Sequence, residues 1–440
     1  MCGFIAGKYL RKDLDKLLDL MDYRGLKGFR GKHNIDNIYM GHVSLPFVNL
    51  DPRVAIQPYV DERNTPYMLV GEIFNHNIFG TFLNDTECIS ELYKDYGHDV
   101  FHDFDGFWSF VTVVKGSLIC YTDHLGIKPV YYRTDMEALA SEITVLRELG
   151  KCTHNETFLS NVLKWGYNPG PETPWNEIKQ IPPGHYYYEG KVYPYWNWEQ
   201  VPYEDLRNDI FRSVKNRLKG QREVALLLSG GLDSTIIYSV LKSLNKSIKV
   251  IHVENEEAEF AEKVLAYFGD KDEVLKIDFK NVGKNAALLT HQTPVDLGSV
   301  KPQIAMAREI EKLGIHCVLS GDGADELFGG YRRANEYDSQ YSDVFMELPY
   351  YHLPRLDRTM MRSTIELRCP FLAPCIIKQA LKTPYALRNG LKKALINAFA
   401  SDIPIEIVQR KKHALKTPEI RNEPLQERLL NIKSWREIYD

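Results

Sequence analysis

The sequence lacks features that would direct the chain to a membrane or an oxidising compartment. It has no apolar run of about 18 residues, the least that a membrane-spanning helix needs. The apolar stretch after Met1 ends at Lys8, too early for a secretory signal peptide. Its seven cysteines are odd in number and form no CxxC pair, which disfavours a disulfide framework or a zinc site. We therefore expect a cytoplasmic protein without a membrane partner.

An excess of positive charge is also lacking. The chain has 55 Lys and Arg against 59 Asp and Glu, a net charge of -4, and the basic residues are spread along it. Nucleic-acid-binding proteins usually gather a basic excess on one face, so no nucleic-acid partner is expected. The 440 residues exceed one ordinary core at roughly 100–200 residues per domain. We expect two domains, residues 1–200 and 201–440.

The two halves differ in their hydrophobic pattern. Residues 1–200 contain short alternating segments typical of strands and two stretches of helical period. The strands are expected at Tyr67–Val70, Phe107–Val114 and Ser117–Tyr121, and the helices at Leu14–Met21 and Thr86–Tyr96. From Asp205 onward, apolar strands such as Val224–Leu228 and Ile248–Val253 alternate with helical segments, which predicts a parallel sheet. Between the halves, Ile181–Tyr203 is expected to contain the end of the first domain and a connector, with aromatic rings that pack an interface.

A glycine-rich loop, Leu228-Ser229-Gly230-Gly231-Leu232-Asp233-Ser234, follows the first of these apolar strands and precedes a helix. The glycines let backbone N–H groups approach phosphate oxygens, and the helix presents its positive end. The loop has neither the GxxxxGK[ST] nor the GxGxxG spacing, which disfavours transfer of a terminal phosphoryl group and dinucleotide binding. It predicts a pyrophosphate cradle; a capped structural turn is the alternative.

A second loop, Ser320 to Tyr331, follows the apolar segment Cys317–Leu319 and places Asp322, Asp325 and Glu326 within five residues. Three carboxylates so close would repel one another, and a bound cation or substrate amine would relieve that repulsion. A solvated acidic turn is the alternative.

These two loops resemble the SGGxDS loop of ATP pyrophosphatases and the SGEGSDEVFGGY signature of asparagine synthetases. The resemblance implies ATP as a substrate, Mg²⁺ held by Asp233 and Asp325, and a catalytic role near the reacting acid for Asp322, where the family commonly has Glu. The residues implied in binding ATP are Leu228, Ser229, Gly230, Gly231, Asp233, Ser234, Val253, Ser320 and Gly321.

Two basic clusters near the carboxyl end contain Lys392 and Lys412, which resemble the family's paired lysines that meet the departing pyrophosphate. In isolation, such clusters are more often solvated surface. Between the acidic loop and these clusters, Glu366 to Leu372 resembles the family's EARVPFLD. Thr293 to Ser299 loosely matches the stretch where the family contacts its acid substrate.

The amino terminus carries a candidate nucleophile. Removal of Met1 would leave the thiol of Cys2 beside a free α-amine, whose pKa of about 7.7–8.0 in peptides allows it to act as a base. This start resembles class II glutamine amidotransferases, as do three segments downstream: Gly71 to His76 (NGEIYNH), Asp85 to Glu87 (SDxE) and Asp123 to Pro129 (DHLGIxP). The resemblance makes Cys2 catalytic, Gly71 an oxyanion donor, and Asp85 and Glu72 contacts for glutamine.

The amidotransferase-like half departs from the family at three places. Val70 stands where the family has the asparagine of NGE, and Ser44 where it has an arginine for the glutamine carboxylate. The RGPD turn reads Arg24-Gly25-Leu26-Lys27, and Arg53, just downstream of Ser44, is expected to bind the carboxylate instead. Loss of one oxyanion donor typically lowers kcat by about 10²–10³, so weakened or retuned glutamine hydrolysis is expected.

The resemblance spans almost the whole chain and implies an α/β protein. An N-terminal nucleophile (Ntn) αββα sandwich should precede a parallel-sheet α/β domain like that of ATP pyrophosphatases. The implied reaction is ATP-dependent amidation of a carboxylic acid, aspartate first, through an acyl-adenylate, with nitrogen from glutamine or ammonia. Amidation of another acid, or amide formation as in β-lactam synthetases, is one alternative. A binding protein that keeps ATP sites without turnover is another. The family implies a homodimer, although no sequence feature decides this.

Overall fold

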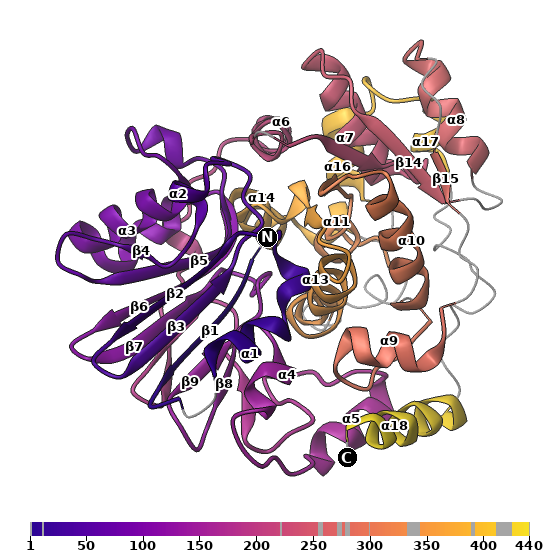
Figure 1. Cartoon of the computed structure of the whole chain (residues 1–440). Coiled ribbons are helices and arrows are strands. Elements are labelled where there is room, and N and C mark those ends of the chain that lie inside the picture. The colour runs from indigo at the N-terminus through magenta and orange to yellow at the C-terminus, as the bar shows by residue number, and fades with distance from the viewer. Residues whose placement is uncertain are drawn as a thin grey trace.

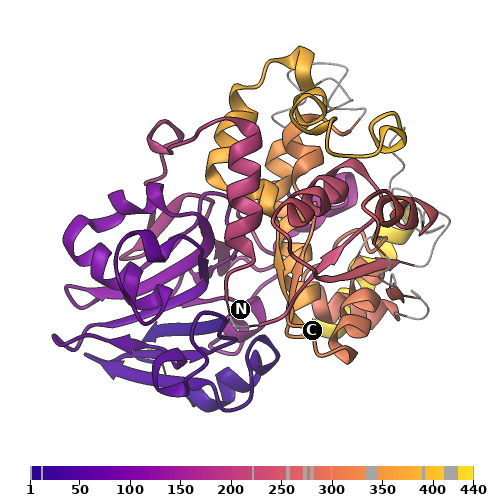
Figure 2. The ribbon, with the colours of Figure 1, turned by 90° about the horizontal axis from the view of Figure 1, so that it is seen from above.

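The computed structural model describes residues 2–10, 13–220, 222–253, 258–270, 275–277, 282–298, 300–331, 344–388, 392–410 and 425–439, without the side chains of residues 253 and 275–277. Two parts lie side by side: a sandwich of antiparallel sheets built by the amino-terminal half, and a parallel sheet surrounded by helices (Figure 1 and Figure 2). The amino terminus lies at their junction.

Two six-stranded antiparallel sheets form the sandwich. The first has the order β10-β8-β9-β1-β3-β2 and the second β12-β11-β7-β6-β5-β4. Their strands are β1 (Gly3–Lys8), β2 (Arg30–Ile35), β3 (Ile38–Val43), β4 (Tyr59–Val60), β5 (Pro66–Ile73), β6 (Gly106–Val114), β7 (Ser117–Thr122), β8 (Tyr131–Arg133), β9 (Ala138–Ala140), β10 (Ile178–Gln180), β11 (His185–Tyr188) and β12 (Lys191–Pro194). Alternate side chains such as Phe4 and Met40 meet Met68 and Val111 in one core between the sheets.

Helices cover both outer faces of the sandwich. α1 (Leu14–Asp19), α4 (Ile143–Arg147) and α5 (Glu156–Trp165) share an apolar core with the first sheet. α3 (Asp85–Tyr96) and the 3₁₀ segment Gly97–Asp103 cover the second, where Phe101 is buried among the rings of Phe104, Trp108 and Tyr121. The expected αββα sandwich is therefore confirmed.

Within Ile181–Tyr203, which was expected to end the first domain and lead into a connector, β11 and β12 form a hairpin of the second sheet. Glu189 and Gly190, with φ of 48° and 78°, make the two-residue turn whose positive φ values match the twist of paired strands. The expectation for its aromatic residues is confirmed: Tyr187 is buried between the sheets, and Tyr195 packs on the outer core of the second sheet.

A five-stranded parallel sheet organises the other half, as the sequence predicts. Its order is β15-β14-β13-β16-β17, formed by β13 (Val224–Leu227), β14 (Lys249–Val253), β15 (Leu275–Ile277), β16 (Cys317–Leu319) and β17 (Glu366–Arg368). The chain runs outward from β13 through β14 to β15, then returns to the other side of β13 for β16. Ligands of such sheets bind at the carboxyl ends of the strands where the direction reverses, here between β13 and β16.

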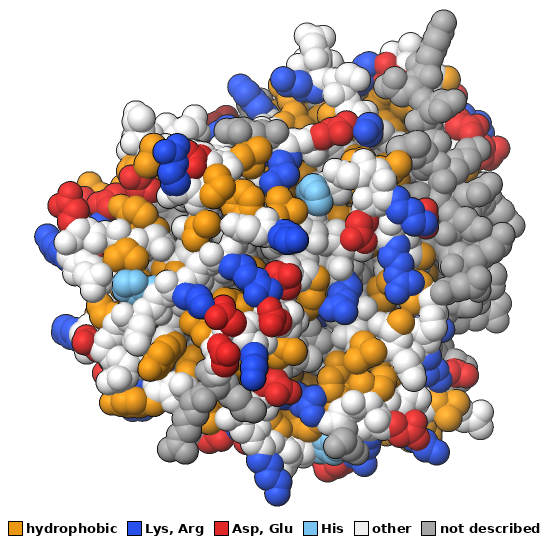
Figure 3. Space-filling view, viewed as in Figure 1, with side chains coloured by type: hydrophobic (Ala, Val, Ile, Leu, Met, Phe, Trp, Pro, Cys, Tyr) orange, Lys and Arg blue, Asp and Glu red, His pale blue; other side chains and the backbone are white. Residues whose placement is uncertain are grey.

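The helices of this half are α6 (Leu206–Arg217), α7 (Leu232–Ser243), α8 (Ala258–Tyr267), α9 (Lys284–His291), α10 (Val300–Lys312), α11 (Ala324–Phe328), α13 (Leu353–Met361), α14 (Pro374–Lys382), α15 (Tyr385–Arg388), α16 (Lys393–Phe399), α17 (Ile405–Val408) and α18 (Leu425–Tyr439). No helix within the described ranges has the length and apolar character that a bilayer crossing requires. The cytoplasmic location stays a prediction. On the face in Figure 3, acidic and basic side chains are intermingled.

Apolar contacts join the two halves. Phe47 and Phe74 of the sandwich belong to the same buried cluster as Ile210 and Leu372. At the carboxyl end, Trp435 of α18 lies 5.1 Å from the ring of Trp175 and donates its indole N–H to the carbonyl of Gln292 at 3.2 Å. Since both parts contribute to shared cores, the domain boundary at residue 200 stays a prediction.

Replacing Phe101, whose side chain is fully buried, tests the outer core of the second sheet. We expect Phe101→Ala to lower the free energy of unfolding of the full chain by about 3–5 kcal/mol, because a large cavity would remain among the rings. Tyr96→Ala, at the exposed end of α3, should change it by no more than about 0.5 kcal/mol. Equal urea midpoints for the two variants would contradict this packing.

Candidate functional site

The glycine-rich loop leaves the parallel sheet at the end of β13. Leu228 donates its N–H to the carbonyl of Ile251 at 2.9 Å, extending the contact with β14 by one residue. Gly230 has a φ of 67°, and a Cβ there would lie 2.6 Å from the backbone nitrogen of Ala261, so only glycine fits. α7 begins at Leu232, directly after the loop. Backbone N–H groups and a helix amino terminus are thus brought to one place, as an anionic phosphate requires.

Hydroxyl groups hold this loop in shape. The Oγ atoms of Ser229 and Ser234 are 3.1 Å apart, and the N–H of Ser229 donates to Ser234 Oγ at 3.2 Å. Ser234 Oγ also donates to the carbonyl of Gly231 at 3.2 Å. The loop is therefore formed before any ligand arrives, which lowers the entropy cost of binding.

The acidic loop follows β16, the neighbour of β13, and contacts the glycine-rich loop. A Cβ on Gly321 would lie 2.9 Å from the Cβ of Asp233. Ser320 Oγ donates to the carboxylate of Asp322, whose pKa is raised by burial. The phenol of Tyr331 donates to Glu326 at 2.5 Å. Two of the three carboxylates thus accept hydrogen bonds from hydroxyl groups of the same loop.

Lys392 joins the two loops from a distant part of the chain. Its ammonium nitrogen lies 2.7 and 2.5 Å from the two carboxylate oxygens of Asp233 and also pairs with Asp325. Three sequence segments that were singled out separately therefore meet at the reversal point of the sheet. Lys412 and the side chain of Val253 lie outside the described residues, although Val253 is the last residue of β14. Their assigned roles stay predictions.

The donors around this point suit a magnesium ion that arrives with phosphate. Within the part of the chain that the structure describes, no group of three or more His, Cys, Asp or Glu side chains could hold a metal. Mg²⁺ is commonly bound by one or two carboxylates, completed by substrate phosphates and water. The pair Asp233 and Asp325 fits that mode, and does not fit a metal held by protein groups alone.

Cys2 immediately precedes β1 and is 5% exposed, in the core between the two sheets. Burial raises the pKa of its thiol to about 11, although the backbone N–H of Leu45 offsets part of that rise. A thiol with this pKa is neutral near pH 7. It can act as a nucleophile only if a base removes its proton.

Gly71 and Glu72 lie in β5, and the buried carboxyl group of Asp85, at the start of α3, lies beside them. Gly71 in β5 has a φ of 126°, and a Cβ there would lie 2.0 Å from the carbonyl oxygen of Phe107. Burial and the charge of Asp85 raise the pKa of the neighbouring Glu72 carboxyl well above its usual range. Asp85 accepts a hydrogen bond from the N–H of Ile73 at 3.1 Å, and burial raises its pKa too. These carboxyl groups suit a ligand with an amine.

At two of the positions where the sequence departs from the family, the side chain is neutral and its contacts are with neutral groups. Val70 is buried in the same cluster as Cys2 and contributes only methyl groups. The hydroxyl of Ser44 lies 2.9 Å from Nδ1 of His42, whose pKa burial lowers to about 3, so this ring is neutral. The structure does not bring Arg53 into this buried region. Its side chain is 89% exposed and pairs with Asp51, so its role in binding glutamine stays a prediction without geometric support.

A buried charge network connects Cys2 to the other half of the molecule. The guanidinium of Arg24 donates to the carbonyl of Cys2 at 3.0 Å, to Glu142 at 2.6 Å and to Asp357 at 2.8 Å. Lys128 pairs with the other oxygen of Asp357 at 2.9 Å. Burial alone would raise the pKa of Asp357, but the charges of Arg24 and Lys128 outweigh it and lower this pKa to about 2. Since Asp357 belongs to α13, the network crosses the junction.

Sequence reasoning missed the role of Asp357 because it lies outside the matched motifs. Lys128 was noticed only as part of a motif, and Arg24 only as part of a departure. One signal was present: Leu353–Met361 is an otherwise apolar stretch that contains Arg355, Asp357 and Arg358, all of them buried. Charged residues within an apolar helix indicate buried ion pairs, although their partners cannot be read from the sequence.

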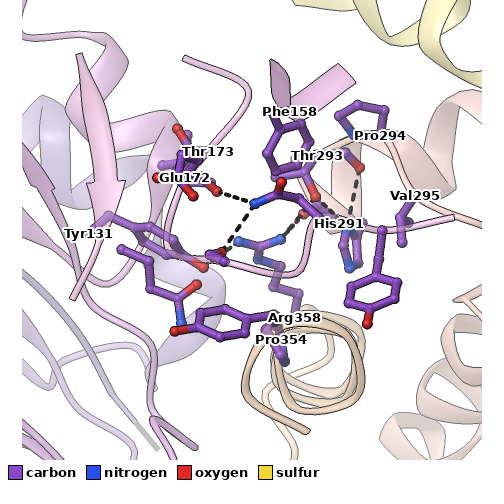
Figure 4. A pocket seen from close by; sticks show the side chains of 16 residues that line it. Tyr131, Phe158, Glu172, Thr173, His291, Thr293, Pro294, Val295, Pro354 and Arg358 are labelled. Atoms are coloured by element: carbon purple, nitrogen blue, oxygen red, sulfur yellow. Dashed lines mark hydrogen bonds between the residues drawn. The ribbon is translucent and has the colours of Figure 1, made fainter. Parts of the chain in front are cut away.

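A pocket with about 400 Å³ of empty volume, partly open to solvent, adjoins this network (Figure 4). Tyr131 and Glu172 of the sandwich line it, together with His291, Thr293 and Arg358 of the other half. Arg358 extends from α13 between Tyr131 and His291, donating to the phenol oxygen of the former and, at 2.6 Å, to the carbonyl of the latter. The stretch matched loosely to contacts with the acid substrate thus has its first residues, Thr293 to Val295, at the junction.

Removing the charge of Asp357 tests this network. Asp357→Asn would leave Arg24 and Lys128 buried with too little negative charge, so we expect it to lower the free energy of unfolding by about 3–5 kcal/mol at pH 7. Asp19→Asn removes one carboxylate from a surface pair with Arg30 and should cost about 1 kcal/mol or less. Urea unfolding of both full-length variants gives the comparison, and similar losses would contradict the network.

The pH dependence of the free energy of unfolding gives a second test of the charge on Asp357. The pKa of Asp357 in the folded chain, about 2, is below its ordinary 3.8, so its stabilisation is complete above pH 3.8 and is lost as the pH falls towards 2. Over that range the wild type should lose more stability than Asp357→Asn. Parallel curves would contradict the assignment.

Comparison with known proteins agrees with the two-part arrangement. The sequence profile described as asparagine synthase matches residues 205–345 and 337–436, and that of a glutamine amidotransferase domain matches residues 1–196. Asparagine synthetase B [glutamine-hydrolyzing] of Escherichia coli K12 is 26% identical over 461 residues, covering 92% of this chain and 78% of that protein. Asparagine synthetase [glutamine-hydrolyzing] 3 of Arabidopsis thaliana is 27% identical and covers 87% and 71%, respectively.

Among solved structures, glutamine phosphoribosylpyrophosphate amidotransferase from B. subtilis matches with a TM-score of 0.33 and 12% identity over 73% of this chain and 81% of that one, a likeness too low to support an argument. The synthase profile alone spans more than half of this chain. With its amino-terminal glutamine amidotransferase domain, the chain belongs to the asparagine synthase family.

Proposed function

We propose that this protein is a ligase that converts L-aspartate to L-asparagine, cleaving ATP to AMP and pyrophosphate and taking nitrogen from glutamine hydrolysed at Cys2 or from free ammonia. The observation that carries the proposal is the meeting of the glycine-rich loop, the acidic loop and Lys392 at one end of the parallel sheet. Relatives named asparagine synthetase support the choice of aspartate.

In the first step the substrate carboxylate attacks the α-phosphorus of ATP. An oxygen–phosphorus bond forms as the bond to pyrophosphate breaks, which gives an acyl-adenylate. The N–H groups of Gly230 and Gly231 hold the phosphates, and Lys392 neutralises the leaving group. Mg²⁺, held by Asp233 and Asp325, would supply further positive charge along the phosphates.

In the second step ammonia attacks the acyl carbon and AMP leaves. The attacking nitrogen must lose a proton, and the pKa of the Asp322 carboxyl in the acidic loop is raised by desolvation. A carboxylate with a raised pKa is a better base than an ordinary one, which suits Asp322 to accept that proton.

In the amidotransferase half, the α-amine freed by removal of Met1 would take the proton from the Cys2 thiol, which otherwise stays neutral. The thiolate attacks the glutamine amide, the N–H of Gly71 stabilises the oxyanion, and Glu72 and Asp85 hold the substrate amine. Ammonia leaves, and water releases glutamate from the thioester. Val70 offers no second oxyanion donor, which lowers the expected rate of this half-reaction by about 10²–10³.

Product analysis by mass spectrometry tests the whole reaction, with ATP, Mg²⁺, aspartate and either amide-labelled glutamine or ammonium. We expect labelled asparagine from glutamine, abolished in Cys2→Ala, while that variant still makes asparagine from ammonium. Cys375→Ala, which changes a thiol of the other half, should leave both activities intact.

Each other outcome has a definite meaning. Asparagine from ammonium alone would show that the amidotransferase half no longer serves the reaction. Lack of asparagine from either nitrogen source would refute aspartate as the substrate, and an exchange of labelled pyrophosphate into ATP with other acids would then identify the acid.

A single variant separates the two half-reactions. Asp233→Asn should reduce aspartate-dependent exchange of pyrophosphate into ATP by about 100-fold or more, since it removes a carboxylate from the proposed metal site. Glutamine hydrolysis should persist, because Cys2 lies in the other half. Glu309→Gln on the exposed side of α10 is the matched control and should change neither rate. Loss of both activities in Asp233→Asn would contradict the separation.

A further inference from the structure

Lys392 occupies a closed position between the two carboxylates proposed to hold magnesium. Its side chain is largely buried, and its ammonium nitrogen contacts both oxygens of Asp233, at 2.7 and 2.5 Å, and one oxygen of Asp325. A buried ammonium needs such partners, because leaving it unpaired in the protein interior is costly. The carboxylates and the ammonium therefore stabilise one another in the protein without its ligands.

The backbone near Lys392 is packed closely against its side chain. Lys392 itself has a φ of 45° and a ψ of 42°, a left-handed conformation that costs a residue with a side chain about 1–2 kcal/mol. A Cβ on Gly330 would lie 2.6 Å from Lys392 Cε and 1.8 Å from the carboxylate of Asp325. A side chain at position 330 would thus displace either group. The position of the lysine is imposed by close packing from the acidic loop.

A divalent cation and this ammonium compete for the two carboxylates. Mg²⁺ takes its oxygen ligands at about 2.0–2.1 Å, and both oxygens of Asp233 already contact Lys392. Two positive charges at such a separation repel strongly inside a protein. Displacement of the lysine therefore favours binding of the metal, and the displaced ammonium needs another anion.

From this geometry we infer that Lys392 stands in for the metal in the nucleotide-free protein, so that a divalent cation binds tightly only together with the nucleotide, whose phosphates receive the displaced ammonium. This inference rests on the proposed function, because it takes a nucleotide as the ligand of the glycine-rich loop. By linkage, the metal must strengthen nucleotide binding by the same factor as the nucleotide strengthens metal binding. Free metal alone is disfavoured at this site.

The test measures binding of Mn²⁺ to the full-length protein by electron paramagnetic resonance, alone and with α,β-methylene-ATP, which cannot be cleaved between its first two phosphates. The wild type should bind Mn²⁺ weakly alone and much more tightly with the nucleotide. Lys392→Met should bind Mn²⁺ alone about tenfold more tightly than the wild type, because the repulsion is gone. The nucleotide should then add correspondingly less.

Two control variants separate competition at the site from a general change of charge. Lys392→Arg keeps a cation at the same position and should retain the weak binding of Mn²⁺ alone. Lys393→Met removes a charge from the next residue, which is only partly buried, and should change the affinity by less than about twofold. The inference fails if Lys392→Met binds Mn²⁺ alone no better than the wild type, or if Lys393→Met shows the same gain.

This measurement needs neither an acid substrate nor turnover. Failure of pyrophosphate exchange with every acid would refute the proposed reaction and leave the competition between Lys392 and Mn²⁺ standing. Conversely, an active ligase whose Lys392→Met variant gains no affinity for Mn²⁺ would refute the competition alone.

Discussion

The arrangement of the two halves depends on the salt bridge between Arg24 and Asp357. Both side chains are buried, so water does not screen the interaction. The same guanidinium holds the carbonyl of Cys2, and Lys128 completes the neutralisation of Asp357. Removing any one member would leave the others without compensation in a medium that solvates charge poorly. The backbone at Cys2 and helix α13 are thus linked through Arg24, and Lys128 adds a second ion pair between the halves.

Apolar side chains also pack across the junction, beside further ion pairs such as Arg217 with Asp105. Phe107 and Leu125 of the sandwich pack in one cluster with Phe371 and Leu372. The Nε2 atom of His124 lies 3.0 Å from the carbonyl oxygen of Leu372. Burial lowers the pKa of His124, so it adds no charge there near neutral pH. In the proposed reaction, such apolar surfaces would exclude water and favour neutral ammonia over ammonium.

The sequence predicts those features of the fold that local patterns determine. The glycine-rich loop, the acidic loop and each strand of the parallel sheet are short contiguous segments. The structure places the two loops against each other as neighbouring strands require. The hairpin within Ile181–Tyr203 was missed because its turn residues are Glu189 and Gly190 rather than a stronger turn pair. The role of Asp357 could not be found, since its partner Arg24 is 333 positions away. Pairing over such separations depends on how the halves dock, which local propensity does not specify.

The amidotransferase half keeps some functional groups of the family and lacks others. The two groups that it lacks would affect different kinetic constants. The buried thiol, the tightly packed Gly71 and the carboxyl groups of Glu72 and Asp85 keep the groups that would bind an amine and stabilise an oxyanion. The neutral side chains of Val70 and Ser44 replace an oxyanion donor and a cation. A donor that acts only on the transition state affects kcat, whereas a cation that holds the substrate equally in both states affects KM. We therefore expect glutamine hydrolysis to be weakened in both terms, whereas the proposed ligase reaction involves neither residue.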